Sequence, residues 1–161
     1  METEQKVKDA LNWIMAIIEK DAIPYQIVGG LAARAYGAKR PINDIDMYIP
    51  VESVEKILPY VKDFISKPLK HYEEELWDVT YFQLKYKDQK IEIGLSPGAK
   101  FYDKINAVWV DQTIDFSYFT KRQVYGIEIM IMPRSVLIDY KKQLAREVDI
   151  IDIAEMETIQ L

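Results

Sequence analysis

The sequence contains no cysteine and only one histidine, His71. The absence of cysteine excludes a disulfide framework and a thiolate zinc site. A single histidine argues against a His-based metal cluster and against a Ser-His-Asp triad. His71 stands in the segment KPLKHYEEE and is interpreted as a solvated loop residue. Any catalysis would therefore depend on carboxylates, lysine, arginine or a bound metal ion.

Long apolar runs are also missing from the sequence. No stretch approaches the length needed to span a bilayer, and the N-terminal METEQKVKDALNW lacks the basic-then-apolar layout of a secretory signal. We therefore expect a cytoplasmic protein with no membrane partner. With 21 basic and 26 acidic residues, the net charge is −5. This acidic balance argues against nucleic acid as a partner, although a local basic patch would be compatible with it.

The composition that remains is that of an ordinary globular domain. The chain has 161 residues, of which 49% are apolar and 29% are charged. This length suits one domain with a sizeable core. Because the sequence shows no repeat, no low-complexity tract and no obvious boundary, we predict a single domain over residues 1–161.

Hydrophobic periodicity predicts interleaved helices and strands. Helices are expected over residues 4–20, 31–36, 50–65 (with Pro59 as a kink or early break), near 100–107, and from 134 to about 157. Strands are expected over residues 25–28, 44–49, 76–86, 90–94 and 124–132, with a hairpin turn at 87–89. Together these elements predict an α+β fold, with a mixed twisted sheet and helices packed largely on one side.

Two glycines, Gly29 and Gly30, separate the strand at 25–28 from the helix that follows. Glycines at such a place let the backbone approach a ligand closely. The start of the helix presents unpaired N–H groups and the positive end of the helix dipole, which together suit a phosphate. The alternative interpretation is an ordinary turn between a strand and a helix.

The strand Asp44-Ile45-Asp46-Met47-Tyr48-Ile49 places two carboxylates on one face. Asp44 and Asp46 repel each other unless a cation lies between them. Mg²⁺ prefers such hard oxygen ligands and is often bound by one or two carboxylates together with substrate phosphates. The alternative is an edge strand whose acidic residues face solvent.

A third carboxylate would complete a site for two metal ions. Glu92, in Lys90-Ile91-Glu92-Ile93, faces the opposite side of its strand from its apolar neighbours. Asp78 is the rival candidate for this role. Glu92 would otherwise be a polar residue on the solvated face of a hairpin.

The run Val28-Gly29-Gly30, then thirteen intervening residues, then Asp44-Ile45-Asp46-Met47 resembles the signature of the DNA polymerase β-like nucleotidyltransferase superfamily. The stretch from Arg40 to Asp46 is similar to the Arg-x-Thr-x-Asp-apolar-Asp form of small antibiotic-type members, with Ile42 in place of the common Thr. In length and order of elements the chain looks like the lincosamide nucleotidyltransferases and uncharacterised relatives. The motif match covers about residues 25–50, the hairpin at 82–98 matches more loosely, and beyond residue 100 the resemblance is faint.

This resemblance implies the transfer of a nucleoside monophosphate from a nucleoside triphosphate to an acceptor hydroxyl, with release of pyrophosphate. It implies that Gly29 and Gly30 hold the triphosphate. Asp44 and Asp46 would bind two Mg²⁺ or Mn²⁺ ions, and Glu92 would share a metal or deprotonate the acceptor. Arg40 would neutralise phosphate charge, because a guanidinium matches phosphate oxygens; its alternative is a solvated loop arginine.

The expected C-terminal helix places Lys142, Arg146 and Asp149 on one stripe, with Val136, Leu137, Tyr140, Leu144, Val148 and Ile151 directed inward. The charged stripe could meet a triphosphate in a cleft, or it could be a solvated face. Most of the tyrosines and tryptophans are interpreted as core and interface residues.

The acceptor is expected to be a small molecule or a protein. The rival to an enzyme is a non-catalytic protein of the same fold, acting as one half of a toxin–antitoxin pair or as a nucleotide sensor. Because a short chain leaves little room for an acceptor domain, we also expect a homo-oligomer or a stable partner protein.

Overall fold

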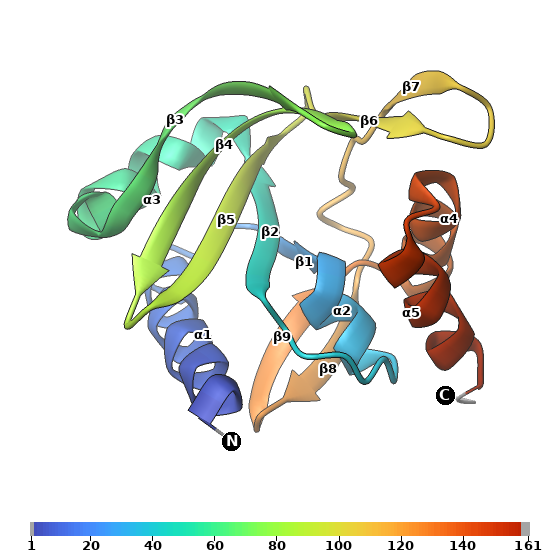
Figure 1. The fold of residues 1–161 in the computed structure, drawn as a ribbon. Coiled ribbons are helices and arrows are strands. Elements are labelled where there is room, and N and C mark those ends of the chain that lie inside the picture. Colours follow the sequence, from blue (N-terminus) through green and yellow to red (C-terminus); the bar gives the residue numbers. More distant parts are fainter. Residues whose placement is uncertain (1, 159–161) are drawn as a thin grey trace.

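The computed structural model describes residues 2–158 (Figure 1). The α-helices are α1 (Glu2–Lys20), α2 (Gly29–Ala35), α3 (Val54–Val61), α4 (Arg134–Leu144) and α5 (Glu147–Thr158), with short 3-10 turns η1 (Val51–Ser53) and η2 (Lys62–Phe64) on either side of α3. The strands are β1 (Gln26–Val28), β2 (Asp44–Pro50), β3 (Ile65–Glu74), β4 (Trp77–Tyr86), β5 (Gln89–Ser96), β6 (Lys100–Asp103), β7 (Val108–Asp111), β8 (Thr120–Val124) and β9 (Ile127–Ile131). The predicted domain limits of 1–161 include residues 1 and 159–161, which lie outside the described part.

Within residues 2–158 the strands form one sheet in the order β7-β6-β4-β5-β2-β1-β9-β8, and β3 pairs with β4 outside this order. The β2–β5 and β1–β9 pairs are parallel, whereas the other pairs are antiparallel. The sheet is therefore mixed, and the α+β class predicted from the sequence is confirmed. Of the helices in this part of the chain, none is both long enough and apolar enough for a membrane crossing.

Apolar and polar side chains alternate along the first residues of β2, so this strand has one apolar face and one polar face. Ile45, Met47 and Ile49 are fully buried in the core. The apolar stripe of α1 contributes Val7, Leu11, Ile14 and Ile18 to the same core. Asp44 and Asp46 point to the other face. In Figure 1, α1 and α3 lie on one side of the central strands, and α4 and α5 stand on the other.

The helix predicted over residues 50–65 is present as α3 with 3-10 turns on both sides, over residues 51–64, but the strand that follows it was missed. Helix α3 ends at Val61, two residues after Pro59, and β3 begins at Ile65. β3 pairs with β4 along most of its length. His71 therefore lies in a strand rather than in a loop, although it is exposed. Its strand state depends on the partner β4, which local sequence patterns do not reveal.

One further prediction of secondary structure was wrong, and another was right only in part. The segment expected as a short helix near 100–107 contains strand β6, which pairs with β4 and β7. The strand expected over 124–132 is present as β9, but it begins only at Ile127 and forms a hairpin with β8, which was not predicted. Its turn is formed by Tyr125 and Gly126, which have φ values of 56° and 77°. Two successive residues of positive φ reverse the chain as in a hairpin turn.

The predicted C-terminal helix is interrupted at Ala145, which adopts a left-handed conformation with φ of 51°. This break rotates the residues after it relative to those before it. Val136 and Ile151, predicted to face inward, are 40% and 46% exposed. The buried positions of α5 are instead Asp149, Asp152 and Met156.

Candidate active site

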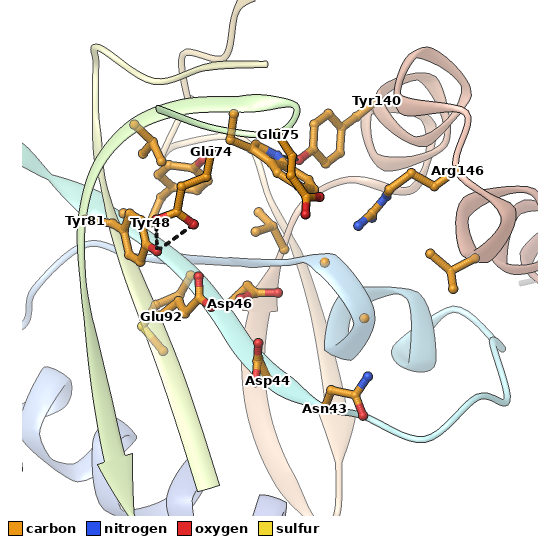
Figure 2. A pocket seen from close by; sticks show the side chains of 18 of the residues that line it. Asn43, Asp44, Asp46, Tyr48, Glu74, Glu75, Tyr81, Glu92, Tyr140 and Arg146 are labelled. Atoms are coloured by element: carbon orange, nitrogen blue, oxygen red, sulfur yellow. Dashed lines mark hydrogen bonds between the residues drawn. The ribbon is translucent and has the colours of Figure 1, made fainter. Parts of the chain in front are cut away.

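Three carboxylates meet on the polar face of the sheet. Strands β2 and β5 are parallel neighbours, and their register places Asp46 directly beside Glu92. Asp44, Asp46 and Glu92 each offer a carboxylate oxygen within 4.8 Å of the others. Figure 2 shows the three side chains converging on one pocket. Asp44 and Asp46 share a face because successive side chains alternate along a strand, and the pairing with β5 adds Glu92.

Asp78, the rival to Glu92, lies on the other side of its strand. On β4, Trp77, Val79 and Tyr81 line the pocket. The intervening Asp78 points away from it, and its Oδ1 lies 2.5 Å from Nε2 of His71. The structure therefore groups Glu92, rather than Asp78, with the two aspartates.

Burial, together with the neighbouring carboxylates, raises the pKa of two members of this group, Asp46 and Glu92. Burial raises the pKa of Asp46 to about 7, with further contributions from the charges of Glu92 and Asp44. Burial also raises the pKa of Glu92, followed by the charge of Asp44. Divalent cations would relieve this repulsion. Because every donor is a carboxylate oxygen, the site fits Mg²⁺ or Mn²⁺ better than a soft metal.

The Gly-Gly turn lies directly beside this carboxylate group. Val28, the last residue of β1, pairs with Asp46 in the register of β2. Gly29 has a φ of +64°, and a Cβ built on it would lie 2.6 Å from Oδ2 of Asp46. The position that requires a left-handed conformation is therefore Gly29, not Gly30. A Cβ on Gly30 would lie 3.4 Å from Nη2 of Arg40.

This geometry predicts different outcomes for substitutions at the two glycines. Gly29→Ala should lower the free energy of unfolding by about 1–2 kcal/mol through its left-handed backbone. It should also weaken Mg-nucleotide binding by displacing Asp46. Gly30→Val should leave the melting temperature near that of the parent and weaken nucleotide binding alone, because its side chain would occupy phosphate space. Urea unfolding and calorimetry distinguish the two. Parent-like binding by Gly30→Val would contradict a phosphate contact there.

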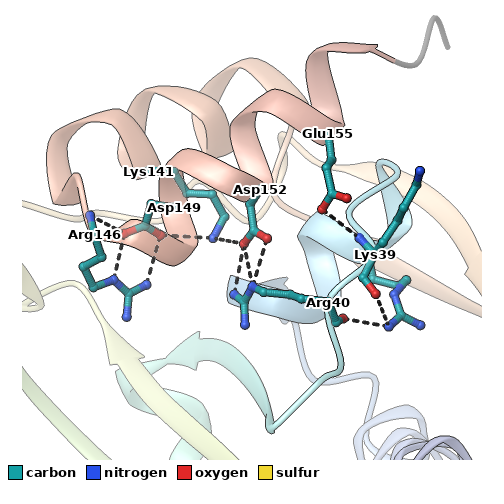
Figure 3. Close-up of polar contacts among 8 residues, drawn as sticks. Lys39, Arg40, Lys141, Arg146, Asp149, Asp152 and Glu155 are labelled. Carbon is teal, nitrogen blue, oxygen red and sulfur yellow. Dashed lines mark hydrogen bonds and ion pairs between the residues drawn. The ribbon is translucent and has the colours of Figure 1, made fainter.

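Three cationic side chains line the same pocket: Arg40, Lys141 and Arg146, called here the pocket cations. Arg40 is not free, because its Nε and Nη2 each lie 2.9 Å from a carboxylate oxygen of Asp152. Arg146 makes the same bidentate contact with Asp149, from Nε at 2.7 Å and from Nη2 at 3.0 Å. Figure 3 shows these contacts in one row along α5.

The charged stripe predicted on the C-terminal helix does not form. Lys142 is exposed, and its Nζ lies 3.9 Å from the exposed Glu157. Its neighbour Lys141 is 1% exposed and contacts both Asp149 and Asp152, at 3.4 and 3.0 Å. The break at Ala145 explains the difference, because a stripe at i, i+4 and i+7 requires a continuous helix.

The pocket has a volume of about 600 Å³ and an aromatic wall. The aromatic residues that line it are Tyr48, Tyr72, Trp77, Tyr81 and Tyr140. Trp77 donates a hydrogen bond from Nε1 to the hydroxyl of Tyr140 (2.8 Å), and the guanidinium of Arg146 lies 4.9 Å from the Trp77 ring. Most aromatics were predicted to be core residues. Strand alternation over 76–86 puts Trp77 and Tyr81 on one face and could have indicated part of this wall.

The fold is that of nucleotidyltransferases, as solved structures of that fold superpose on this chain and so confirm the fold expected from the sequence. No protein-family model matches the chain, and no curated protein matches it. A candidate nucleotidyltransferase from Thermotoga maritima superposes with a TM-score of 0.72 at 18% identity, over 88% of this chain and 86% of that one. The lincosamide antibiotic adenylyltransferase LnuA, with lincomycin bound, gives a TM-score of 0.64 at 15% identity, over 93% and 96%.

The aminoglycoside-bound structure of ANT(2″)-Ia is also similar. Its complex with adenylyl-2″-tobramycin gives a TM-score of 0.59 at 17% identity, over 93% of this chain and 87% of that one. These superpositions extend along most of each chain and, at identities of 15–18%, show a shared fold alone. What the site does in this chain is a separate question, which depends on its own residues.

Proposed function

We propose that this chain is a metal-dependent nucleotidyltransferase, which transfers a nucleoside monophosphate from a nucleoside triphosphate to a hydroxyl group of a small molecule or protein. The observation that carries this proposal is the convergence of Asp44, Asp46 and Glu92 beside Gly29 in one pocket. Carboxylates whose pKa values are raised, as those of Asp46 and Glu92 are, are typical of a functional site when they line a cleft. The fold shared with adenylyltransferases supports the same conclusion.

Asp44, Asp46 and Glu92 would hold two Mg²⁺ or Mn²⁺ ions. When bound, such ions offset the charge of the triphosphate and make an acceptor hydroxyl easier to deprotonate. The carboxylates in turn would be held in their charged form. Glu92 would serve either as a metal ligand or as the base that takes the acceptor proton.

The rest of the pocket would bind and orient the triphosphate. The backbone at Gly29 and Gly30 is open to close approach by phosphate oxygens. The pocket cations would balance the charge of those oxygens. In the reaction, a bond forms between the acceptor oxygen and the α-phosphorus. The bond from this phosphorus to the bridging oxygen breaks, and pyrophosphate leaves with that electron pair.

We place the acceptor along the aromatic wall, on the side of the pocket formed by β3 and β4. Tyr72 and Tyr81 line the pocket there with Glu74, whose carboxylate accepts a hydrogen bond from the Tyr81 hydroxyl. Such a surface suits a compact hydroxylated compound. The lincomycin bound to LnuA and the adenylyl-tobramycin bound to ANT(2″)-Ia support a small-molecule acceptor over nucleic acid. The cytoplasmic location and the oligomer or partner protein stay predictions.

The proposal is tested by nucleotide binding and transfer. Calorimetry with each of the four ribonucleoside triphosphates should show binding that requires Mg²⁺ or Mn²⁺. Incubation with the bound nucleotide, labelled at the α-phosphate, and a panel of hydroxylated antibiotics and sugars should yield labelled adduct and pyrophosphate. A protein that binds none of the four nucleotides with either metal would contradict the proposal.

A further inference from the structure

Two fully buried acids stand behind the pocket and take no part in the mechanism described above. Asp149 and Asp152, on successive turns of α5, have no exposed surface. Neither lines the pocket, whereas all three pocket cations do. Seen from the pocket, the acids therefore lie behind the cations.

The contacts between these acids and the pocket cations form one continuous network of ion pairs, in which acidic and basic side chains alternate (Figure 3). Asp152 binds Arg40 at one end, and Asp149 binds Arg146 at the other. Lys141 lies between the two acids and contacts both. This network of ion pairs joins the loop that precedes β2 to the start of α5, so it links segments more than a hundred residues apart in the sequence.

The geometry favours positioning over a purely stabilising role. Burying ion pairs seldom gains stability over apolar residues of similar volume. A bidentate contact between a carboxylate and an arginine, in contrast, fixes the plane and direction of the guanidinium. Arg146 is fixed further by the Trp77 ring on which it lies. Asp149 also accepts a hydrogen bond from the backbone N–H of Arg146, at 3.1 Å, which anchors the residue itself.

We infer that Asp149 and Asp152 are positioning residues, which hold the pocket cations in the arrangement that binds the triphosphate of the substrate. This inference rests on the proposed function. Its physical basis is that an ordered cation loses less conformational freedom on binding an anion than a mobile one does. The acids would act only through the cations and would not touch the nucleotide.

A positioning role and a simple effect of charge predict opposite changes in polyphosphate affinity when Asp149 or Asp152 is neutralised. Removing an acid makes the pocket more positive, so charge alone would tighten binding of a polyphosphate anion. Positioning predicts the reverse, because the cations lose their anchors. The variants are Asp149→Asn and Asp152→Asn. The matched control is Glu157→Gln, which removes one acid from the same helix and breaks an exposed ion pair between α4 and α5.

The probe is inorganic tripolyphosphate with Mg²⁺, titrated by calorimetry into the whole protein, alongside KM and kcat for transfer. Each aspartate variant should bind tripolyphosphate about 10- to 100-fold more weakly, as expected for the loss of charge-assisted hydrogen bonds. KM for the nucleotide should rise by a similar factor, with a smaller change in kcat. Glu157→Gln should stay within about twofold of the parent, as an exposed pair contributes little.

A further pair of variants keeps the test open if Asp152→Asn does not fold. Lys141→Met combined with Asp152→Asn removes one buried charge of each sign, so the buried network keeps its net charge. Compared with Lys141→Met alone, the double variant should bind tripolyphosphate more weakly. Equal or tighter binding in the aspartate variants, with intact binding by the parent, would overturn the positioning role and leave the proposed function standing. A parent that binds neither tripolyphosphate nor nucleotide would overturn both.

Discussion

Asp46→Asn and Asp44→Asn should each abolish nucleotidyl transfer while leaving the fold intact. Asparagine keeps the shape of aspartate but removes the charge that holds a metal ion. We expect a loss of kcat on the order of 10³-fold or more, comparable to removing an essential electrostatic or proton-transfer group. The melting temperature of the metal-free protein should be equal or higher, because repulsion among the carboxylates is relieved. Asp111→Asn, on the exposed strand β7, is the control and should remain active.

The pH dependence of stability provides an independent measurement on the same variants. In the folded, metal-free protein the pKa of Asp46 is raised from 3.8 to about 7. Between these values the folded state holds a proton that the unfolded state has lost, so stability falls as pH rises from about 4 to about 7. The loss in the free energy of unfolding over this pH range is on the order of a few kcal/mol. Asp46→Asn should flatten this slope in urea unfolding, and saturating Mg²⁺ should offset it at neutral pH. Parallel curves for parent and Asp46→Asn would contradict the crowded carboxylate site.

Glu92→Gln and Asp78→Asn should differ sharply in activity. Both remove one carboxylate charge from adjacent strands of the same sheet. Glu92→Gln should reduce transfer as severely as Asp46→Asn, because Glu92 lies within reach of the same ions. Asp78→Asn should stay within about threefold of the parent, since the charge it removes lies on the other face and is largely screened by solvent.

Steady-state transfer rates and Mn²⁺ titrations on both proteins provide the comparison. Asp78→Asn should also lower the pKa of His71, which the contact with Asp78 now raises. This shift, followed by NMR, shows that the substitution has had its local effect even where activity is unchanged. A severe loss in Asp78→Asn together with a mild one in Glu92→Gln would reverse the assignment of the third carboxylate.

Several features of the site could be predicted from the sequence because they depend on local geometry. The period of two along a strand puts Asp44 and Asp46 on one face, whatever the strand pairs with. The glycines after β1 predicted a close approach of the backbone to a ligand, which stays a prediction; the structure shows that Gly29 itself lies against the Asp46 carboxylate. The α+β class followed from the interleaving of helical and strand patterns.

Other features were decided only by the tertiary structure. Both Glu92 and Asp78 were candidates, and the parallel register of β2 with β5 is a long-range pairing that groups Glu92 with the aspartates. Strand β3 was missed because its backbone partners lie on β4. The helix break at Ala145 turned Asp149 and Asp152 inward, where a continuous helix would have placed Val148 and Ile151. A local pattern fixes which side chains share a face, but which faces meet depends on contacts between segments distant in the chain, and buried acids are tolerated only where such contacts supply their cations.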